Sequence, residues 1–398
     1  MRDRIGGRVM HPFARRVLFY SHNGVGVGHL QRQLDLAAAY RARHPESAVL
    51  LATGSPGVSM FDFPAGIDFL KLPSLVMVDR YRTWTPRDLA VPTEVVSAMR
   101  AELLHRTVRT FQPDLLVADF MPAGVYGELL PALEELERRG GTAVAGFRDV
   151  VDEPAFVRAL WEETGVYAAL RRHYAAICVY GDVRMLDFAT AYGLSGRVPA
   201  VHYCGYLGRE RQEARRAIRC GRPLILATSG GGVDGSFLLE RFCETAARIR
   251  PRLGGTWIAV TGPLMSDRDH ARVEALAHLS GVEIRRVVPA LRSLVAQADC
   301  VVGMAGYNSV CDILSFQRPA VLVPRPGPSM EQSIRAARLH DWGTAQVVAK
   351  DELTPDRLAL AITAALSQTT IPAAPLTLAG IANALDVLDA ATAQADAA

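Results

Sequence analysis

The sequence lacks the features that mark several special classes of protein. No uninterrupted apolar run among its 398 residues approaches the roughly 18 residues that a membrane span needs. The net charge of +3 is spread without a block of like charges, which argues against a nucleic-acid partner. The six cysteines are scattered, and no two have the spacing of a zinc site or a redox pair. We therefore expect a cytoplasmic protein whose cysteines are small buried residues, and the sequence indicates no particular oligomeric state.

Hydrophobic residues are abundant, at 49% of the chain, and a chain of this length can hold two domains with separate cores. Short apolar runs alternate with stretches of helical periodicity, a pattern typical of parallel strands crossed by helices. In the first half the pattern predicts strands at 17–21, 48–52, 115–118, 143–147 and 176–180, and helices at 30–43, 93–111, 124–139 and 183–192. In the second half it predicts strands at 224–228, 256–261, 282–288, 300–303, 320–324 and 345–349, and helices at 237–249, 268–279, 290–297, 309–316 and 331–340.

Between these halves, from Cys204 to Pro223, the sequence becomes charged and glycine-punctuated, which is typical of an interdomain connection. We predict an α/β protein with a doubly wound domain over residues 1–205 and a second over residues 206–372. A final helix within residues 373–398 is expected to cross back to the first domain. The domains would face a central cleft, lined by loops at the carboxyl ends of both sets of strands.

The stretch "SHNGVGVGHL" follows the first predicted strand and opens a helix. Its glycines, including Gly26 and Gly28, let a ligand approach main-chain amides that favour an anion. A dinucleotide-binding loop would need a glycine where His29 stands and an acid after the second strand, which reads "LLATGS". We therefore expect no nicotinamide or flavin cofactor. His29 is either a catalytic base or hydrogen-bond donor, or a helix-start residue that orders the loop.

Ser229, Gly230, Gly231 and Gly232 follow the first strand of the second domain and precede a helix. A hydroxyl residue and three glycines make an amide-rich nest suited to a phosphate or diphosphate, although a plain flexible turn would look alike. The loop lacks the lysine of a P-loop, so hydrolysis of a nucleoside triphosphate is not indicated.

Two further loops follow later strands of the same domain. In "GMAGYNSVCD", Asp312 lies about one turn into a helix, where its carboxylate either accepts hydrogen bonds from a vicinal diol such as a ribose or only complements the helix dipole. Glu331 and Gln332 begin the next helix, where they either read sugar hydroxyls or form a solvated helix start. The combination describes a sugar nucleotide, and the donor-binding candidates in these loops are Gly306, Asn308, Ser309, Asp312, Glu331 and Gln332.

At these residues the sequence resembles the GT-B glycosyltransferases, and within them the branch of the peptidoglycan N-acetylglucosaminyltransferases. Gly28-His29 matches the end of the family's first-domain glycine loop, and Ser229 to Gly232 matches its Gly-Gly-Ser type loop. Asp312 falls on the family's ribose-binding acid, and Glu331-Gln332 falls on its sugar-reading Gln-Gln pair. The segments "GFRDVVDEP" and "PRPGPSMEQSIRA" are similar to a group of bacterial predicted glycosyltransferases related to that branch.

The resemblance implies a GT-B fold of two Rossmann-like domains, with a UDP-linked sugar donor held mainly by the second. It also implies that the reaction inverts the anomeric carbon and requires no metal ion or cofactor. Main-chain groups near Val288, in the loop before Leu291, would read the base of the donor. Asp312 is one methylene shorter than the family glutamate and Glu331 replaces a glutamine, so the sugar stays open between a hexose and an N-acetylhexosamine.

An inverting transfer needs a base for the acceptor hydroxyl and an anion cradle for the leaving diphosphate. We assign the cradle to the amides of Ser229 to Gly232, assisted by Gly26 to Gly28. His29 leads the candidates for the base, with Asp119 and Asp149, each just past a first-domain strand, as alternatives.

Two arginines are candidates for a phosphate or acceptor contact, Arg148 and Arg325, although Arg148 could equally pair with Asp149. The acceptor is expected on the first domain, whose segment from Leu72 to Val91 is long, aromatic and mixed in charge. We expect a small soluble acceptor or natural-product intermediate, and a membrane contact through Leu75 to Val78 is the alternative. A sugar-nucleotide 2-epimerase and a non-catalytic nucleotide-sugar-binding protein also stay open, but the pattern around His29 favours a transferase.

Overall fold

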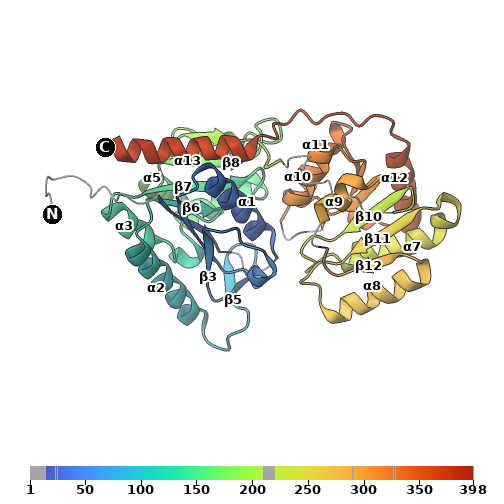
Figure 1. The fold of residues 1–398 in the computed structure, drawn as a ribbon, viewed down its shortest axis with the longest axis horizontal. Coiled ribbons are helices and arrows are strands. Elements are labelled where there is room, and N and C mark those ends of the chain that lie inside the picture. The colour runs from blue at the N-terminus through green and yellow to red at the C-terminus, as the bar shows by residue number, and fades with distance from the viewer. Residues whose placement is uncertain are drawn as a thin grey trace.

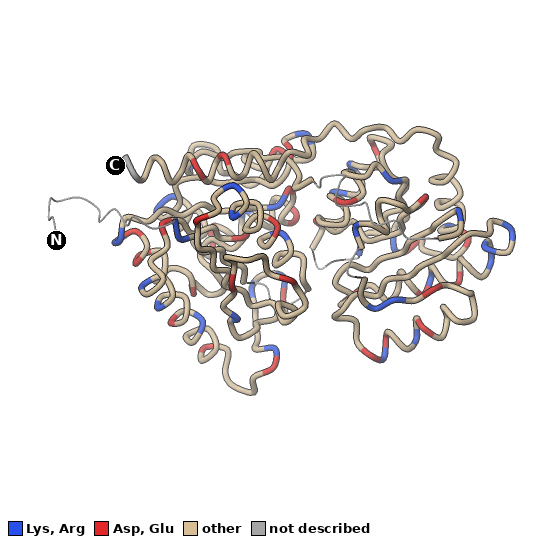
Figure 2. Tube along the Cα trace, in the orientation of Figure 1, with Lys and Arg blue, Asp and Glu red and all other residues tan. Residues whose placement is uncertain are grey.

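The computed structural model describes residues 15–22, 24, 26–208, 220–288, 291–325, 327 and 329–397. These residues form two separate parallel sheets, each covered by helices, in two units that lie side by side (Figure 1). Positively and negatively charged residues are interspersed along the chain in both units (Figure 2). None of the helices in the described ranges is both long and apolar enough to span a membrane.

The first sheet has seven parallel strands in the order β3-β2-β1-β6-β7-β8-β9. Strands β6, β7 and β8 are buried along their whole length, as expected where helices cover both faces of a parallel sheet. The strand bounds are β1 (Arg16–Ser21), β2 (Ala48–Thr53), β3 (Ile67–Lys71), β6 (Leu115–Asp119), β7 (Thr142–Arg148), β8 (Ala176–Tyr180) and β9 (Val201–Tyr203).

The helices of the first unit are α1 (Gly28–Arg43), α2 (Thr93–Phe111), α3 (Leu130–Arg138), α4 (Pro154–Glu163), α5 (Val166–His173) and α6 (Phe188–Ala191). Helix α4 begins where the carboxylate of Glu153 accepts the backbone N–H groups of Ala155 and Phe156. An antiparallel hairpin, β4 (Leu75–Asp79) and β5 (Thr83–Pro86), lies beside the sheet and carries much of the segment expected to bind the acceptor.

The second sheet has six parallel strands in the order β12-β11-β10-β13-β14-β15. Helix α8 is capped by the Ser266 hydroxyl and α12 by the Thr354 hydroxyl, which explains where both helices begin. The strands are β10 (Leu224–Thr228), β11 (Thr256–Val260), β12 (Glu283–Arg285), β13 (Cys300–Gly303), β14 (Ala320–Leu322) and β15 (Gln346–Val347). The helices are α7 (Ser236–Leu253), α8 (Asp267–Ser280), α9 (Leu291–Gln297), α10 (Tyr307–Phe316), α11 (Glu331–Asp341) and α12 (Pro355–Ser367).

Both sheets reverse their strand order at one point. In the first sheet this point lies between β1 and β6, and in the second it lies between β10 and β13. Ligands of open parallel sheets bind at the carboxyl ends of the strands that flank such a point. The loops after these four strands are therefore the expected positions of ligand-binding and catalytic residues.

The chain passes between the units twice, and the two passages are bonded to each other. Tyr206 donates its backbone N–H to the carbonyl of Thr377 at 2.7 Å, and Gly380 donates its own to the carbonyl of Tyr206 at 2.9 Å. Leu207 and Ala379 form an antiparallel bridge. The final helix, α13 (Gly380–Ala397), then packs along the first unit against α1, β7 and β8 (Figure 1).

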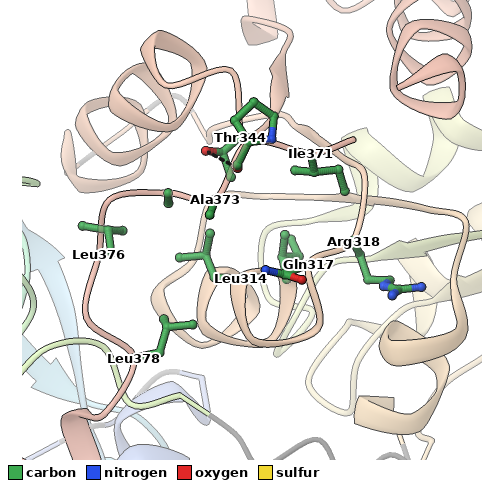
Figure 3. Close-up of a pocket in the computed structure, with 11 residues that line it drawn as sticks. Leu314, Gln317, Arg318, Thr344, Ile371, Ala373, Leu376 and Leu378 are labelled. Atoms are coloured by element: carbon green, nitrogen blue, oxygen red, sulfur yellow. Dashed lines mark hydrogen bonds between the residues drawn. The ribbon is translucent and has the colours of Figure 1, made fainter. Parts of the chain in front are cut away.

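A small cavity lies under the second passage, between the end of α10 and residues 371–378 (Figure 3). Its volume is about 150 Å³ and its lining is mainly apolar, with Leu314, Ile371 and Leu376 among the residues that face it. It lies away from the strand-end loops, so it belongs to the packing of the crossing segment.

The structure differs from the sequence expectations in several elements. The helix expected over 124–139 begins at Leu130, because Gly124 (φ 73°) and Tyr126 (φ 51°) adopt left-handed backbone conformations. The helix expected over 183–192 is only Phe188–Ala191, and the strands expected over 282–288 and 345–349 shorten to Glu283–Arg285 and Gln346–Val347. Strands β3 and β9 and helices α4, α5 and α12 were not expected. Residues 209–219 of the expected connection lie outside the described residues.

Candidate active site

The loop after β1 and the end of β6 place three side chains in contact. His29, in the first turn of α1, has its Nδ1 atom 2.6 Å from Oδ2 of Asp119, the last residue of β6. Arg32, one turn further along α1, donates from Nη2 to both carboxylate oxygens of Asp119 at 2.8 Å. Asp119 and Arg32 are buried, whereas 15% of the His29 side chain is exposed. The imidazole is thus the accessible member of a buried charged cluster.

The charges in this cluster determine which ring nitrogen of His29 carries the proton. Burial raises the pKa of Asp119, but the positive charge of Arg32 and the hydrogen bonds that Arg32 and His29 donate outweigh it and hold that pKa well below its usual range. Arg32 Nη2 also lies 2.7 Å from Nδ1 of His29, but its hydrogens have both Asp119 oxygens as acceptors. The ionised carboxylate therefore accepts the Nδ1–H of His29, which leaves Nε2 with its lone pair.

His29 is neutral over a wider pH range than an ordinary histidine. Burial lowers its pKa, and the Asp119 carboxylate opposes this only in part, while Arg32 adds to the lowering. A neutral imidazole with a fixed Nδ1–H and a free Nε2 is the form that takes a proton from a hydroxyl group.

Aromatic side chains surround the imidazole. Phe120 stacks on His29 with ring centroids 4.8 Å apart and an interplanar angle of 18°. His22 contacts His29, Phe120 and Trp84 edge to face, at centroid distances of 5.6, 5.0 and 5.4 Å. Trp84 and Tyr81, whose ring is 5.9 Å from that of Phe120, come from the β4–β5 hairpin and the turn between its strands. The hairpin therefore supplies two aromatic side chains that contact His22 and Phe120, the two ring neighbours of His29.

Asp149 follows β7 and does not join this cluster. Its carboxylate is buried and accepts hydrogen bonds from Nε and Nη2 of Arg335, at 2.7 and 2.6 Å, and from the hydroxyl of Tyr206. Burial raises its pKa, but the Arg335 guanidinium, from α11 of the second unit, holds the pKa below its usual range. Asp149 joins the two units through an ion pair whose donors occupy both of its oxygens.

Arg148 and Glu331 make a second ion pair between the units. Arg148 Nη1 lies 2.8 Å from Oε2 of Glu331, and neither side chain is more than 10% exposed. Arg325 donates to Glu331 at 3.4 Å and to Asp234 at 2.9 Å, and its backbone N–H donates to Oε1 of Gln332 at 3.0 Å. The arrangement places Glu331 at the boundary between the units, in ion pairs with Arg148 of the first unit and Arg325 of the second.

The loop after β10 faces the first glycine loop. A Cβ atom built on Gly231 would lie 3.5 Å from the Cα atom of Gly26. Gly230 and Gly232 have φ values of 64° and 96°, which non-glycine residues adopt at a cost, and a Cβ on Gly232 would lie 2.3 Å from the carbonyl oxygen of Thr261. Ser229 does not offer its hydroxyl to a ligand, because it donates to the Thr261 carbonyl at 2.6 Å.

The loop after β13 also reaches the first unit. Gly306 precedes α10, and the first turn of that helix contains Asn308 and Ser309. Asn308 donates from Nδ2 to the carbonyl of Gly28 at 3.0 Å. One turn later, Asp312 lies 3.7 Å from Nε of Arg292, which also pairs with Asp35 of α1 at 3.1 Å.

Val288 lies before α9, and its carbonyl accepts the N–H of Leu291 at 3.1 Å. Residues 289 and 290 of that loop lie outside the described residues. Within the described ranges no group of three His, Cys, Asp or Glu side chains is arranged to hold a metal ion.

Sequence reasoning missed several residues that the structure brings to the site. Arg32 and Arg335 are each one helical turn from a candidate, His29 and Glu331 respectively, and that spacing was an available signal. Phe120 directly follows Asp119, but its contact with His29 depends on a backbone turn that no pattern in the sequence predicts. Asp152, which accepts Arg80 at 2.6 Å and the N–H of Met330 at 2.8 Å, is a further link between the units.

Comparison with known proteins gives consistent findings. Residues 256–383 match the model of the glycosyltransferase family 28 C-terminal domain. The chain is 32% identical over 381 residues to the UDP-N-acetylglucosamine--N-acetylmuramyl-(pentapeptide) pyrophosphoryl-undecaprenol N-acetylglucosamine transferase of Nitrobacter hamburgensis, covering 87% of this chain and 95% of that protein.

Among solved structures, the glycotransferase of kitacinnamycin matches with a TM-score of 0.60 and 17% identity, over 97% of this chain and 96% of that one. MurG of Acinetobacter baumannii matches with a TM-score of 0.54 and 14% identity, over 94% and 99% of the two chains. At such low sequence identity these matches show a shared fold and nothing about shared function.

Proposed function

The chain belongs to the GT-B glycosyltransferases, with a family 28 C-terminal domain, and we propose that it is an inverting enzyme that needs no metal ion. The proposed donor is a UDP-linked hexose or N-acetylhexosamine, and the proposed acceptor is a small soluble molecule with a hydroxyl group. The observation that carries this proposal is the cluster of His29, Asp119 and Arg32 at the switch point of the first sheet, opposite the glycine loop of the second.

We assign the base to His29. As the acceptor oxygen attacks the anomeric carbon, its proton passes to Nε2 of His29 and the bond from that carbon to the diphosphate breaks. Asp119 keeps its negative charge and stabilises the imidazolium that forms, through the hydrogen bond to Nδ1. Its burial and its bonds to Arg32 make Asp119 a positioning group rather than the base.

The leaving diphosphate carries the negative charge that develops in the reaction. We assign its binding to the main-chain amides of Ser229 to Gly232, opposite Gly26 to Gly28. Asp312 is assigned to the ribose, and Gly306, Asn308 and Ser309 to the neighbouring part of the donor, because they lie at the switch point of the second sheet. Val288 and Leu291 remain our candidates for binding the nucleobase of the donor.

Asp149 and Arg148 are assigned to holding the units together. Both oxygens of Asp149 are bonded within a buried ion pair, so the carboxylate is poorly placed to take a proton. Arg148 pairs with Glu331, and Glu331 with Gln332 would meet the donor sugar at this boundary. Arg325 is a candidate for the same region. Because the cysteines are scattered small residues, five of the six buried, we also propose that the enzyme works in the cytoplasm.

A thermal-shift screen tests the donor assignment. Wild-type protein is heated with UDP-, TDP- and GDP-linked hexoses and N-acetylhexosamines, each compared with the free nucleoside diphosphate. A ligand at 100 times its dissociation constant stabilises the folded state by about 2.7 kcal/mol, which is a measurable shift. We expect UDP sugars to give the largest shift. If no nucleotide sugar stabilises the protein, the proposed donor site is wrong.

A further inference from the structure

Phe120 has an unusual backbone. Its φ of 56° lies in the left-handed region, which a bulky aromatic residue adopts only when the surrounding structure compels it. The backbone N–H of Phe120 donates to the carbonyl of Gly146 at 2.8 Å, so the turn is anchored to the neighbouring strand. The side chain is only 6% exposed. A glycine would suit this backbone better, so what the phenyl ring contacts is informative.

The left-handed turn brings two consecutive side chains to one imidazole. Along an extended strand, successive side chains point to opposite faces of the sheet. At the end of β6 the turn breaks this alternation: the Asp119 carboxylate bonds to Nδ1 of His29, and the Phe120 ring stacks on the face of the same imidazole. Because Nδ1 is bonded to Asp119, Nε2 is the ring nitrogen available to accept a proton.

Resting on the proposed function of His29, we propose that Phe120 is the positioning residue that fixes the plane of the His29 imidazole. The carboxylate of Asp119 alone would let the ring pivot about the line from Nδ1 to Oδ2. The stacked phenyl ring removes this freedom, so that Nε2 keeps one direction toward the acceptor.

The ring of Phe120 is itself held from several sides. His22 and Tyr81 meet it edge to face at 5.0 and 5.9 Å, and the guanidinium carbon of Arg148 lies 5.3 Å from its centroid. These contacts come from the loop after β1, from the turn of the β4–β5 hairpin and from β7. A ring contacted from three elements can act as a rigid support, as a loosely packed side chain could not.

Histidine NMR on wild type and Phe120→Leu tests the proposal without any substrate. The protein is labelled with ¹³C and ¹⁵N in histidine, and the His29 signals are identified by their loss in His29→Gln. In the wild type we expect the Nδ1–H tautomer and a Cε1 proton shifted upfield by the stacked ring. In Phe120→Leu the upfield shift should disappear, and in Phe120→Tyr, which keeps an aromatic plane, it should return.

Turnover provides the second readout, with any donor and acceptor that the wild type uses. We expect Phe120→Leu to lower kcat by about 10- to 100-fold while KM for the donor changes less than about twofold. Phe120→Tyr should recover most of the loss. The proposal is overturned if ¹³C relaxation shows the His29 imidazole of Phe120→Leu to be as rigid as that of the wild type, or if Phe120→Tyr fails as badly as Phe120→Leu.

Two glycine variants distinguish loss of the phenyl ring from loss of folding. Phe120→Gly removes the ring and relieves the left-handed backbone, and Gln112→Gly relieves a similar φ of 52° at the exposed end of α2. Both should fold, but only Phe120→Gly should move the His29 signals. Because the NMR result needs no reaction, it stays readable even if nucleotide sugars prove not to bind, so failure of the proposed function and failure of this inference are distinguishable.

Discussion

The carboxyl edges of the two sheets share one topology but present different chemistry. At the first edge the functional groups are side chains: an imidazole, a carboxylate, a guanidinium and a phenyl ring, packed around His29. At the second edge the stretch from Ser229 to Gly232, directly after β10, offers mostly main chain, because three of its four residues are glycines and the hydroxyl of Ser229 donates to Thr261.

The difference indicates how proton transfer and anion binding are divided. Proton transfer requires one atom with a set direction and pKa, which a positioned side chain such as histidine supplies. A diphosphate spreads its charge over many oxygens, and closely spaced amides match that distribution. We therefore expect the first edge to be sensitive to the removal of side-chain atoms, and the second to the addition of a Cβ atom.

The largest effect should follow removal of the imidazole. His29→Ala should lower kcat by about 10²- to 10⁴-fold, because it removes the base. Donor affinity, measured by calorimetry with a non-transferable nucleotide sugar or the nucleoside diphosphate, should stay within about twofold. Equal losses of turnover and donor affinity would place His29 in donor binding instead.

Asp119→Asn should lower kcat by about 10²-fold, because an amide does not enforce the Nδ1–H tautomer of His29. Asp149→Asn is the matched control, since each change leaves a buried arginine, Arg32 or Arg335, without its carboxylate. Both variants should lose about 3–5 kcal/mol of unfolding free energy in denaturant titrations. Only Asp119→Asn should alter the pH dependence of kcat/KM, and a similar alteration in Asp149→Asn would contradict the assignment.

The pH dependence reports on His29 directly. A base works when neutral, so kcat/KM should be constant at high pH and fall about tenfold per pH unit below the pKa of the imidazole. Because burial lowers that pKa, the fall should begin below about pH 6.5, the ordinary value for histidine. Initial rates across this range, with donor and acceptor well below saturation, provide the measurement. A midpoint clearly above the ordinary value would mean that Asp119 dominates over burial.

A smaller effect is expected at the second edge. Gly230→Ala adds a Cβ at φ 64°, where the space around it is open, so the cost is backbone strain that distorts the loop. Gly254→Ala is the matched control, with φ 70°, open space, and a position at the end of α7. Both should lose about 1–2 kcal/mol of stability. Only Gly230→Ala should weaken donor binding, by about tenfold, and an equal effect from Gly254→Ala would remove the loop from the donor site.

The smallest effect concerns the sugar. Glu331→Gln introduces the first amide of the Gln-Gln pair that the family resemblance places at this position, and it weakens the ion pair with Arg148. We expect the ratio of kcat/KM between UDP-hexose and UDP-N-acetylhexosamine donors to change by about threefold to tenfold, the upper figure being equivalent to about 1.4 kcal/mol. An unchanged ratio would show that Glu331 takes no part in recognising the donor sugar.

The sequence predicted the repeating strands and the positions of both glycine loops, because each depends on a local pattern. It identified His29 and Asp119 as separate candidates, but not their hydrogen bond, since they are 90 positions apart in the sequence. The pairing of Asp149 with Arg335 spans 186 positions and depends on how the units meet. The role of Phe120 could not be predicted for another reason. A left-handed backbone conformation is contrary to the local preference of phenylalanine, and only the contacts of the assembled site explain it.

The bonded pair of chain crossings has a consequence for engineering. Because Leu207 and Ala379 bridge each other, the stretch that builds the second sheet leaves the first unit and returns to it at almost one point. Topologically this stretch is an insertion with adjacent ends, the arrangement that best tolerates exchange of one module for another. A chimera joined at these two residues would keep α13 with its own partners and test whether donor preference travels with the inserted module.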